Sequence, residues 1–163
     1  ELSRAEQSVA ALSDRLEGVN GELLRVALGS GRVFEGVLTH VGRDWIQLRS
    51  EAPALDVLVL LNHVQYIDGH FHRVREEDPR KPRRAVTRRL EAIMNARVSV
   101  NIVNAAFETQ CFIDRVGADH VDVVAIGDQR QPLRRHSSAD IAQRRLIPLS
   151  AVEAVFAHSL GPA

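Results

Sequence analysis

The sequence predicts a mainly β protein with some α-helix, built as two tandem five-stranded small barrels that are each preceded by an N-terminal helix. The first observation is an internal repeat, because segment 36–48 recurs as segment 111–123, 75 positions later, with the same Val-Gly pair and the same aspartate two residues after it. The second is a series of short alternating apolar stretches separated by turn residues. The third is an apolar stripe at helical spacing ahead of each series.

The first helix is predicted over residues 2–19, where apolar residues recur at intervals of three and four. Ser3 and Glu6 fit a capping box at its start. We expect this helix to pack on the strands that follow, although the same spacing also suits a short coiled-coil contact between chains. The first-repeat strands are predicted at 23–28, 33–41, 45–49, 57–61 and 64–67. Gly36 lies inside the long second strand, where a bend of a tightly curled sheet is expected.

The second repeat has the same order. A helical stripe is predicted over residues 86–94, and strands are predicted at 98–102, 107–116, 120–126, 146–149 and 152–157. Segment 59–64 matches segment 147–152 at an offset of 88, so the extra 13 positions fall in a long loop, 127–145. The predicted organisation is a first barrel with its helix (1–72), a charged linker with two prolines (73–82), and a second barrel with its helix and the long loop (83–163).

The composition is that of a soluble globular protein, with 45% hydrophobic and 26% charged residues and a formal net charge of zero. Any electrostatic function must therefore come from local patches. The longest apolar run, 57–61, is far short of the roughly 20 residues that a membrane span needs. No signal peptide is recognised, and a cytoplasmic location with no membrane contact is expected. Cys111 is the only cysteine and is expected to be a small buried hydrophobe.

The residues resemble the Sm/LSm fold, an SH3-type barrel that includes the bacterial Sm-like RNA chaperone. The resemblance rests on the helix, the glycine-centred bent strand Gly36-Val37-Leu38, and Leu61-Asn62-His63-Val64 in the place of the second motif. The tandem arrangement also resembles an uncharacterised actinobacterial family with two Sm-like barrels and a GxDWL-like strand. The resemblance implies a β barrel that binds RNA.

The family's RNA pocket does not carry over residue by residue. Members usually have an acidic residue six positions after the motif glycine, where this chain has Gly42 and Gly117. The asparagine that reads uridine has no counterpart in register, and of the second motif only His63 matches. Any RNA binding is therefore expected to use other residues.

Basic residues provide the strongest local charge feature. The candidate nucleic-acid-binding residues are Arg80, Lys81, Arg83, Arg84, Arg88, Arg89, Arg134, Arg135 and His63. Six of the cations fall within ten residues, and such a run can contact phosphates and release counterions. The alternative is a solvated linker and helix face that is partly balanced by the acidic residues 76–78. Few aromatic residues lie near these cations, so base stacking is poorly supported.

No phosphate loop, nucleophile elbow or paired-carboxylate motif is present, so the chain is not expected to be an enzyme or to need a cofactor. His70 and His72 place two imidazoles on one side of an extended segment, but no third ligand completes a metal site. Trp45, the only tryptophan, is expected either on the outer face of its strand or beneath the helix.

The leading functional hypothesis is a non-catalytic binding module for nucleic acid, most directly RNA. The competing hypothesis is a protein-interaction or assembly module without the RNA pocket. Strand 57–61 is apolar on both faces, so we expect it to be covered by the other barrel or by another chain. Pro148 stands in the matching strand of the second repeat and weakens it as a partner for sheet extension. A monomer or homodimer is therefore expected.

Overall fold

The computed structural model describes residues 3–71, 82–127 and 143–163. The described chain contains two α-helices, two single-turn 3₁₀ helices and ten antiparallel strands in one continuous sheet. The elements of the first half are α1 (Arg4–Glu17), β1 (Leu23–Leu28), β2 (Val33–Val41), β3 (Trp45–Glu51), β4 (Ala54–Leu60), η1 (Leu61–His63) and β5 (Val64–Gly69). Those of the second half are α2 (Val86–Asn95), β6 (Ser99–Val103), β7 (Glu108–Val116), β8 (His120–Gly127), β9 (Gln143–Pro148), η2 (Leu149–Ala151) and β10 (Ala154–Ala157).

The mainly β class is confirmed, and the two repeats occupy successive halves of the sheet. The strand order is β5-β1-β2-β3-β4-β10-β6-β7-β8-β9, so both halves place their fifth strand beside their first. The pairing register repeats as well, since Ile46 lies opposite Val59 and Val121 lies opposite Ile147. These pairs reproduce the offsets of 75 and 88 found in the sequence. Most of the expected linker and of the loop 127–145 lies outside the described residues.

The long second strand of each half carries a shift in its pairing register, and in the first half Gly36, where a bend was expected, lies close to the next strand. A Cβ atom on Gly36 would lie 2.7 Å from the carbonyl oxygen of Arg49 on β3, so only glycine fits this close approach of two backbones. The β2–β3 register also shifts between Leu38 and His40, and the β7–β8 register shifts at the matching place, between Ile113 and Arg115. Bulges of this kind increase local twist and allow a small sheet to curl.

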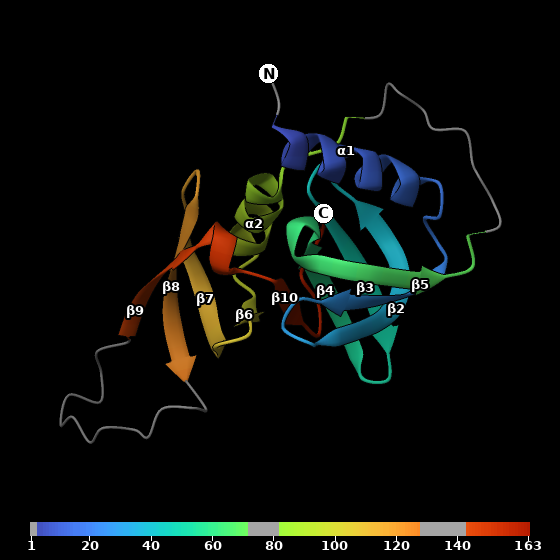
Figure 1. The fold of residues 1–163 in the computed structure, drawn as a ribbon. Coiled ribbons are helices and arrows are strands. Elements are labelled where there is room, and N and C mark those ends of the chain that lie inside the picture. Colours follow the sequence, from blue (N-terminus) through green and yellow to red (C-terminus); the bar gives the residue numbers. More distant parts are fainter. Residues whose placement is uncertain (1–2, 72–81, 128–142) are drawn as a thin grey trace.

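The two halves join through β4 and β10 of the same chain. Leu58 lies opposite Val155 and Val59 lies opposite Ala154, and all four side chains are fully buried. Figure 1 shows the two halves side by side, with α1 across the first half and α2 beside the junction. The strand that the sequence predicted to be covered is thus covered by the other half of its own chain.

Each half also contributes side chains to the core of the other. Trp45, Leu58 and Leu60 point outward from the first half and pack in one cluster with Leu90 and Ile93 of α2. In the other cluster, Val103 and Ala154 of the second half pack with first-half residues. The continuous sheet makes this possible, because the face of β4 that points away from the first-half core continues into the face of β10 that points into the second-half core. Leu58 and Val155, which lie opposite each other, both belong to the second-half cluster.

A side-chain oxygen accepts a hydrogen bond from a backbone N–H at the start of α1 and of α2, from the N-cap residue in α1 and from a distant residue in α2. The capping box of Ser3 and Glu6 is confirmed, and Glu6 accepts a 2.7 Å hydrogen bond from the Ser3 backbone N–H. At α2, the Asp44 carboxylate of the β2–β3 turn accepts a 2.9 Å hydrogen bond from the Val86 backbone N–H. This bond between halves places the start of α2 next to the turn that the repeat is built on.

Two further sequence expectations can be read from the packing. Trp45 lies beneath the start of α2 with 5% of its surface exposed, and its indole Nε1–H donates a 2.9 Å hydrogen bond to the Arg84 carbonyl. Cys111 is buried on β7, and burial raises the pKa of its thiol to about 12. Within the described residues, no helix is long and apolar enough to cross a membrane.

Candidate nucleic-acid interface

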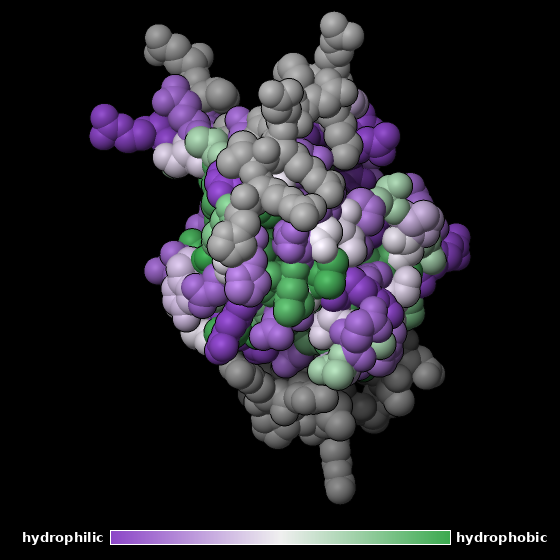
Figure 2. All heavy atoms as spheres, turned by 90° about the vertical axis from the view of Figure 1, so that its right-hand side faces the viewer, coloured by the Kyte–Doolittle hydropathy of each residue, from purple (hydrophilic) through white to green (hydrophobic). Residues whose placement is uncertain are grey.

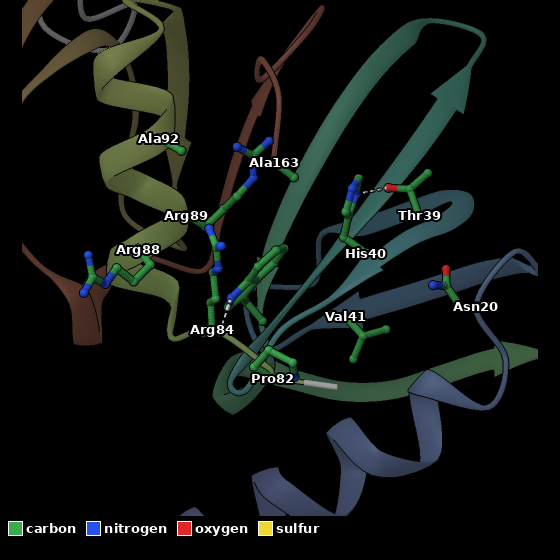
Figure 3. A pocket seen from close by; sticks show the side chains of 11 residues that line it. Asn20, Thr39, His40, Val41, Pro82, Arg84, Arg88, Arg89, Ala92 and Ala163 are labelled. Carbon is green, nitrogen blue, oxygen red and sulfur yellow. Dashed lines mark hydrogen bonds between the residues drawn. The ribbon is translucent and has the colours of Figure 1, made fainter. Parts of the chain in front are cut away.

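A pocket of about 200 Å³ lies between β2 of the first half and α2 of the second. Its lining includes three arginines, Arg84, Arg88 and Arg89, together with His40, Thr39 and Trp45. In Figure 3 the arginines lie on the α2 side of the pocket, and His40 and Thr39 lie on the β2 side. Residues more than 40 positions apart in the sequence therefore form one surface.

Arg84 and Arg88 present their side chains at the surface. Arg88 is on the outer side of α2, where 72% of its side chain is exposed and a 3.7 Å ion pair joins it to Glu91. The backbone carbonyl of Arg84 accepts hydrogen bonds from the Trp45 indole and from the Arg43 backbone N–H, at 2.9 Å each. These bonds hold the Arg84 backbone in place while its side chain remains exposed.

Arg43 joins this surface although the sequence analysis did not select it. It is exposed, and its backbone bond to the Arg84 carbonyl brings two arginines from different halves together. Arg43 stands alone in the sequence between Gly42 and Asp44, so a search for runs of basic residues passes over it. We refer below to Arg43, Arg84 and Arg88 as the arginine surface.

Arg89 has a structural role. Only 3% of its surface is exposed, and its guanidinium donates to the Gln47 side-chain oxygen at 3.0 Å, the Pro162 carbonyl at 3.0 Å and the Gly161 carbonyl at 3.1 Å. Burial lowers the pKa of the Arg89 guanidinium, and the charge of Asp56 acts in the opposite direction. With each of its three nitrogens donating to one of these acceptors, Arg89 connects α2, β3 and the C-terminal segment.

Arg83 also joins elements of the protein. It forms an ion pair with Asp14 of α1, and its guanidinium donates a 2.8 Å hydrogen bond to the Ser13 hydroxyl. Ser13 is fully buried and donates in turn to the Gly42 carbonyl at 2.7 Å. This chain of contacts fixes α1 against the β2–β3 turn, so Arg83 lies near the arginine surface with its charge already paired.

Of the remaining candidates, His63 is described and is not among the residues that line the pocket. His63 belongs to η1, its carbonyl accepts a 3.0 Å hydrogen bond from the Gly29 N–H, and its Nε2 is buried without a hydrogen-bond partner among the described residues. Arg80, Lys81, Arg134 and Arg135 lie outside the described residues. His72 does too, and in the part of the chain that is described no three His, Cys, Asp or Glu side chains gather around a possible metal position.

Apolar side chains are exposed on a different face. Leu23 of β1 and Val37 of β2 lie opposite each other and are 55% and 38% exposed. Figure 2, which views the first-half side of the molecule, shows a group of apolar side chains surrounded by hydrophilic ones. Directly paired apolar residues on an exposed sheet face are a feature of surfaces that bind other proteins.

Comparison of the chain with known protein families, with curated proteins and with solved structures found no match.

Proposed function

We propose that this chain is a non-catalytic nucleic-acid-binding module, most directly for RNA, built from two Sm-like barrels in tandem. The barrels are supported by the repeated strand order, the close backbone approach at Gly36 and the matching register shifts in β2–β3 and β7–β8. Binding is assigned to the arginine surface, where Arg43, Arg84 and Arg88 contact phosphate groups. No catalytic step and no cofactor is part of the proposal.

The observation that carries the proposal is that two exposed arginines, Arg84 and Arg88, line one pocket, while exposed Arg43 of the other half is bonded through its backbone to the Arg84 carbonyl. Guanidinium groups donate hydrogen bonds in a fork that matches phosphate oxygens, which makes arginine well suited to phosphate recognition. The pocket volume of about 200 Å³ is below the range of ligand pockets for whole small molecules, and it suits a single phosphate or sugar-phosphate unit. Binding through phosphates positions a strand without reading its sequence.

The net charge of zero makes this local arrangement decisive. A protein without net charge does not attract nucleic acid through its overall field, so contacts must come from a surface where positive charge dominates. Glu91 balances part of the Arg88 charge, and Asp44 is engaged by the Val86 N–H. A neutral N–H does not cancel the charge of the Asp44 carboxylate, so the three arginines exceed Glu91 and Asp44 by one positive charge.

The test replaces Arg43, Arg84 and Arg88 together by glutamine and measures retention of single-stranded RNA at low salt. Glutamine removes charge and keeps a polar side chain, and the structural bonds of Arg84 use its backbone carbonyl. A matched control replaces Arg4, Arg25 and Arg115, which are exposed elsewhere, and so changes the net charge equally. We expect retention to be lost in the first variant and kept in the control. Equal retention by both variants contradicts the proposal.

The competing function is a protein-interaction module, and the exposed Leu23–Val37 pair favours it. An apolar interface keeps its affinity as salt rises, whereas phosphate binding weakens steeply. Leu23→Ser with Val37→Ser would weaken a protein interface and leave RNA retention unchanged. A protein that retains no RNA at low salt, but loses a protein partner in this double variant, belongs to the competing class.

A further inference from the structure

The β2 wall of the pocket carries an imidazole to which the proposed function assigns no role. His40 lies near the end of β2 and is exposed, and it lies across the pocket from Arg84 and Arg88 (Figure 3). Histidine is the side chain that ordinarily gains or loses its charge between pH 5 and 8. A titratable group therefore faces two permanent positive charges.

The hydrogen bonds around Thr39 determine which ring nitrogen of His40 carries a proton. The Thr39 hydroxyl has one hydrogen and donates it to the Gln47 backbone carbonyl at 3.1 Å, because a carbonyl can only accept. The Thr39 oxygen lies 3.0 Å from His40 Nδ1 and must therefore accept from that nitrogen. The neutral ring then has its lone pair on Nε2, so Nε2 takes up the proton of the charged form.

Buried Gln47 connects this wall of the pocket with the opposite one. Only 4% of its surface is exposed, and its side-chain oxygen accepts the 3.0 Å hydrogen bond from Arg89 of α2. Its backbone carbonyl accepts the bond from Thr39 of β2. Both walls are therefore attached to one buried residue of β3, and a ligand in the pocket can contact both.

The charged groups around His40 are mainly positive. Those that line the pocket are Arg84, Arg88 and Arg89. Those on the neighbouring elements outside the lining are Arg43 and Asp44 of the β2–β3 turn, Glu91 of α2, Glu35 of β2 and Glu22 ahead of β1. Gln47, directly opposite His40 on β3, is neutral. None of the described residues that line the pocket has a carboxylate side chain.

We propose that protonated His40 is a further phosphate-binding residue of this pocket, so that RNA is held between β2 and α2 and binds more tightly as the pH falls. Without RNA, the arginines across the pocket oppose a charge on His40. A phosphodiester between the walls favours that charge, because an opposite charge nearby stabilises the charged form. Protonation and RNA binding therefore strengthen each other by the same factor. The inference rests on the proposed function, since it needs RNA at the arginine surface.

The expected effect is that of one exposed ion pair. Lowering the pH from about 8 to about 5.5 converts an ordinary histidine from mostly neutral to mostly protonated. An exposed ion pair strengthens binding roughly two- to fivefold, and the gain is screened by salt. One added phosphate contact also makes the slope of log affinity against log salt concentration steeper by about 0.7.

The test measures affinity for a single-stranded oligouridylate without terminal phosphates at the two pH values, by fluorescence anisotropy at low salt. Uracil and internal phosphodiesters keep their charge over this range, so the groups that titrate belong to the protein. His40→Gln removes the charge and keeps a polar side chain. His120→Gln is the matched control, because the His120 side chain is 43% exposed and lies outside the pocket lining.

We expect the parent protein and the His120→Gln control to bind roughly two- to fivefold more tightly at the lower pH, and His40→Gln to bind equally at both. Circular dichroism at each pH verifies that all three proteins are folded. A parent affinity that does not change with pH overturns the inference. A pH dependence that persists in His40→Gln, or that is lost equally in the control, also overturns it.

These outcomes are distinct from a failure of the proposed function. The triple glutamine variant of the arginine surface tests phosphate binding at the higher pH, where His40 is mostly neutral. If that variant loses RNA while the parent shows no pH dependence, the arginine surface stands and the role of His40 falls. A parent protein that binds no oligouridylate at either pH overturns both.

Discussion

Two leucines at equivalent positions of the repeat allow the packing between the halves to be tested quantitatively. Leu58 is fully buried at the β4–β10 junction, and Leu146 is 69% exposed on β9. Truncation of a buried leucine to alanine loses transfer free energy and leaves a cavity, at a cost of about 3 to 5 kcal/mol. Leu58→Ala is therefore expected to lower the free energy of unfolding by about that amount.

The matched variant Leu146→Ala is expected to change the free energy of unfolding by less than about 0.5 kcal/mol, because most of the side chain already contacts solvent. Urea titration measures both values. For a chain of this size the Leu58→Ala loss corresponds to a fall of roughly 6 to 20 °C in the thermal midpoint. Equal effects of the two substitutions would refute the assignment of Leu58 to the junction.

Two further predictions concern the core. Ile46→Asp and Val121→Asp each bury an unpaired carboxylate, since 0% and 1% of these side chains is exposed, and each should destabilise its half by several kcal/mol; a thermal midpoint within about 2 °C of the parent in either variant contradicts the assigned strand faces. Burial raises the pKa of the Cys111 thiol to about 12, whereas its pKa in the unfolded chain is near 9. Above pH 9 the folded chain therefore binds more protons than the unfolded chain. The free energy of unfolding should fall as the pH rises from about 9 toward 12. Urea midpoints measured against pH test this, and Cys111→Ala should make the decline shallower, whereas an unchanged decline excludes Cys111 as its source.

Much of the fold can be predicted from the sequence because the two repeats share the same spacing of apolar residues. Ile46 and Val121 occupy matching core positions, and Gly36 marks the bend. The single continuous sheet is harder to predict. Periodicity tells which residues of β4 are apolar, while the identity of the covering strand depends on the three-dimensional placement of β10.

The candidate site was predicted only in part, since a run of basic residues does not say which side chains are free. Arg89 lies at helical spacing from Val86 and Ile93, three residues after one and four before the other, so its position on the buried face of α2 could have been recognised. Arg83 cannot be resolved in this way, because its partners Asp14 and Ser13 lie about 70 residues away. His40 enters the site only through the packing of α2 beside β2, and Arg43 enters it only through its backbone bond to the Arg84 carbonyl.

The most direct test of phosphate binding by the arginine surface is the salt dependence of affinity for single-stranded RNA, measured by fluorescence anisotropy. Each phosphate contact contributes about 0.7 to the slope of log affinity against log salt concentration, so three contacts contribute about 2. That contribution alone weakens binding roughly 20-fold between 50 and 200 mM salt. The triple glutamine variant of Arg43, Arg84 and Arg88 is predicted to have a slope shallower by about 2, and the control variant is predicted to keep the parent slope. An identical slope in all three proteins would contradict the account.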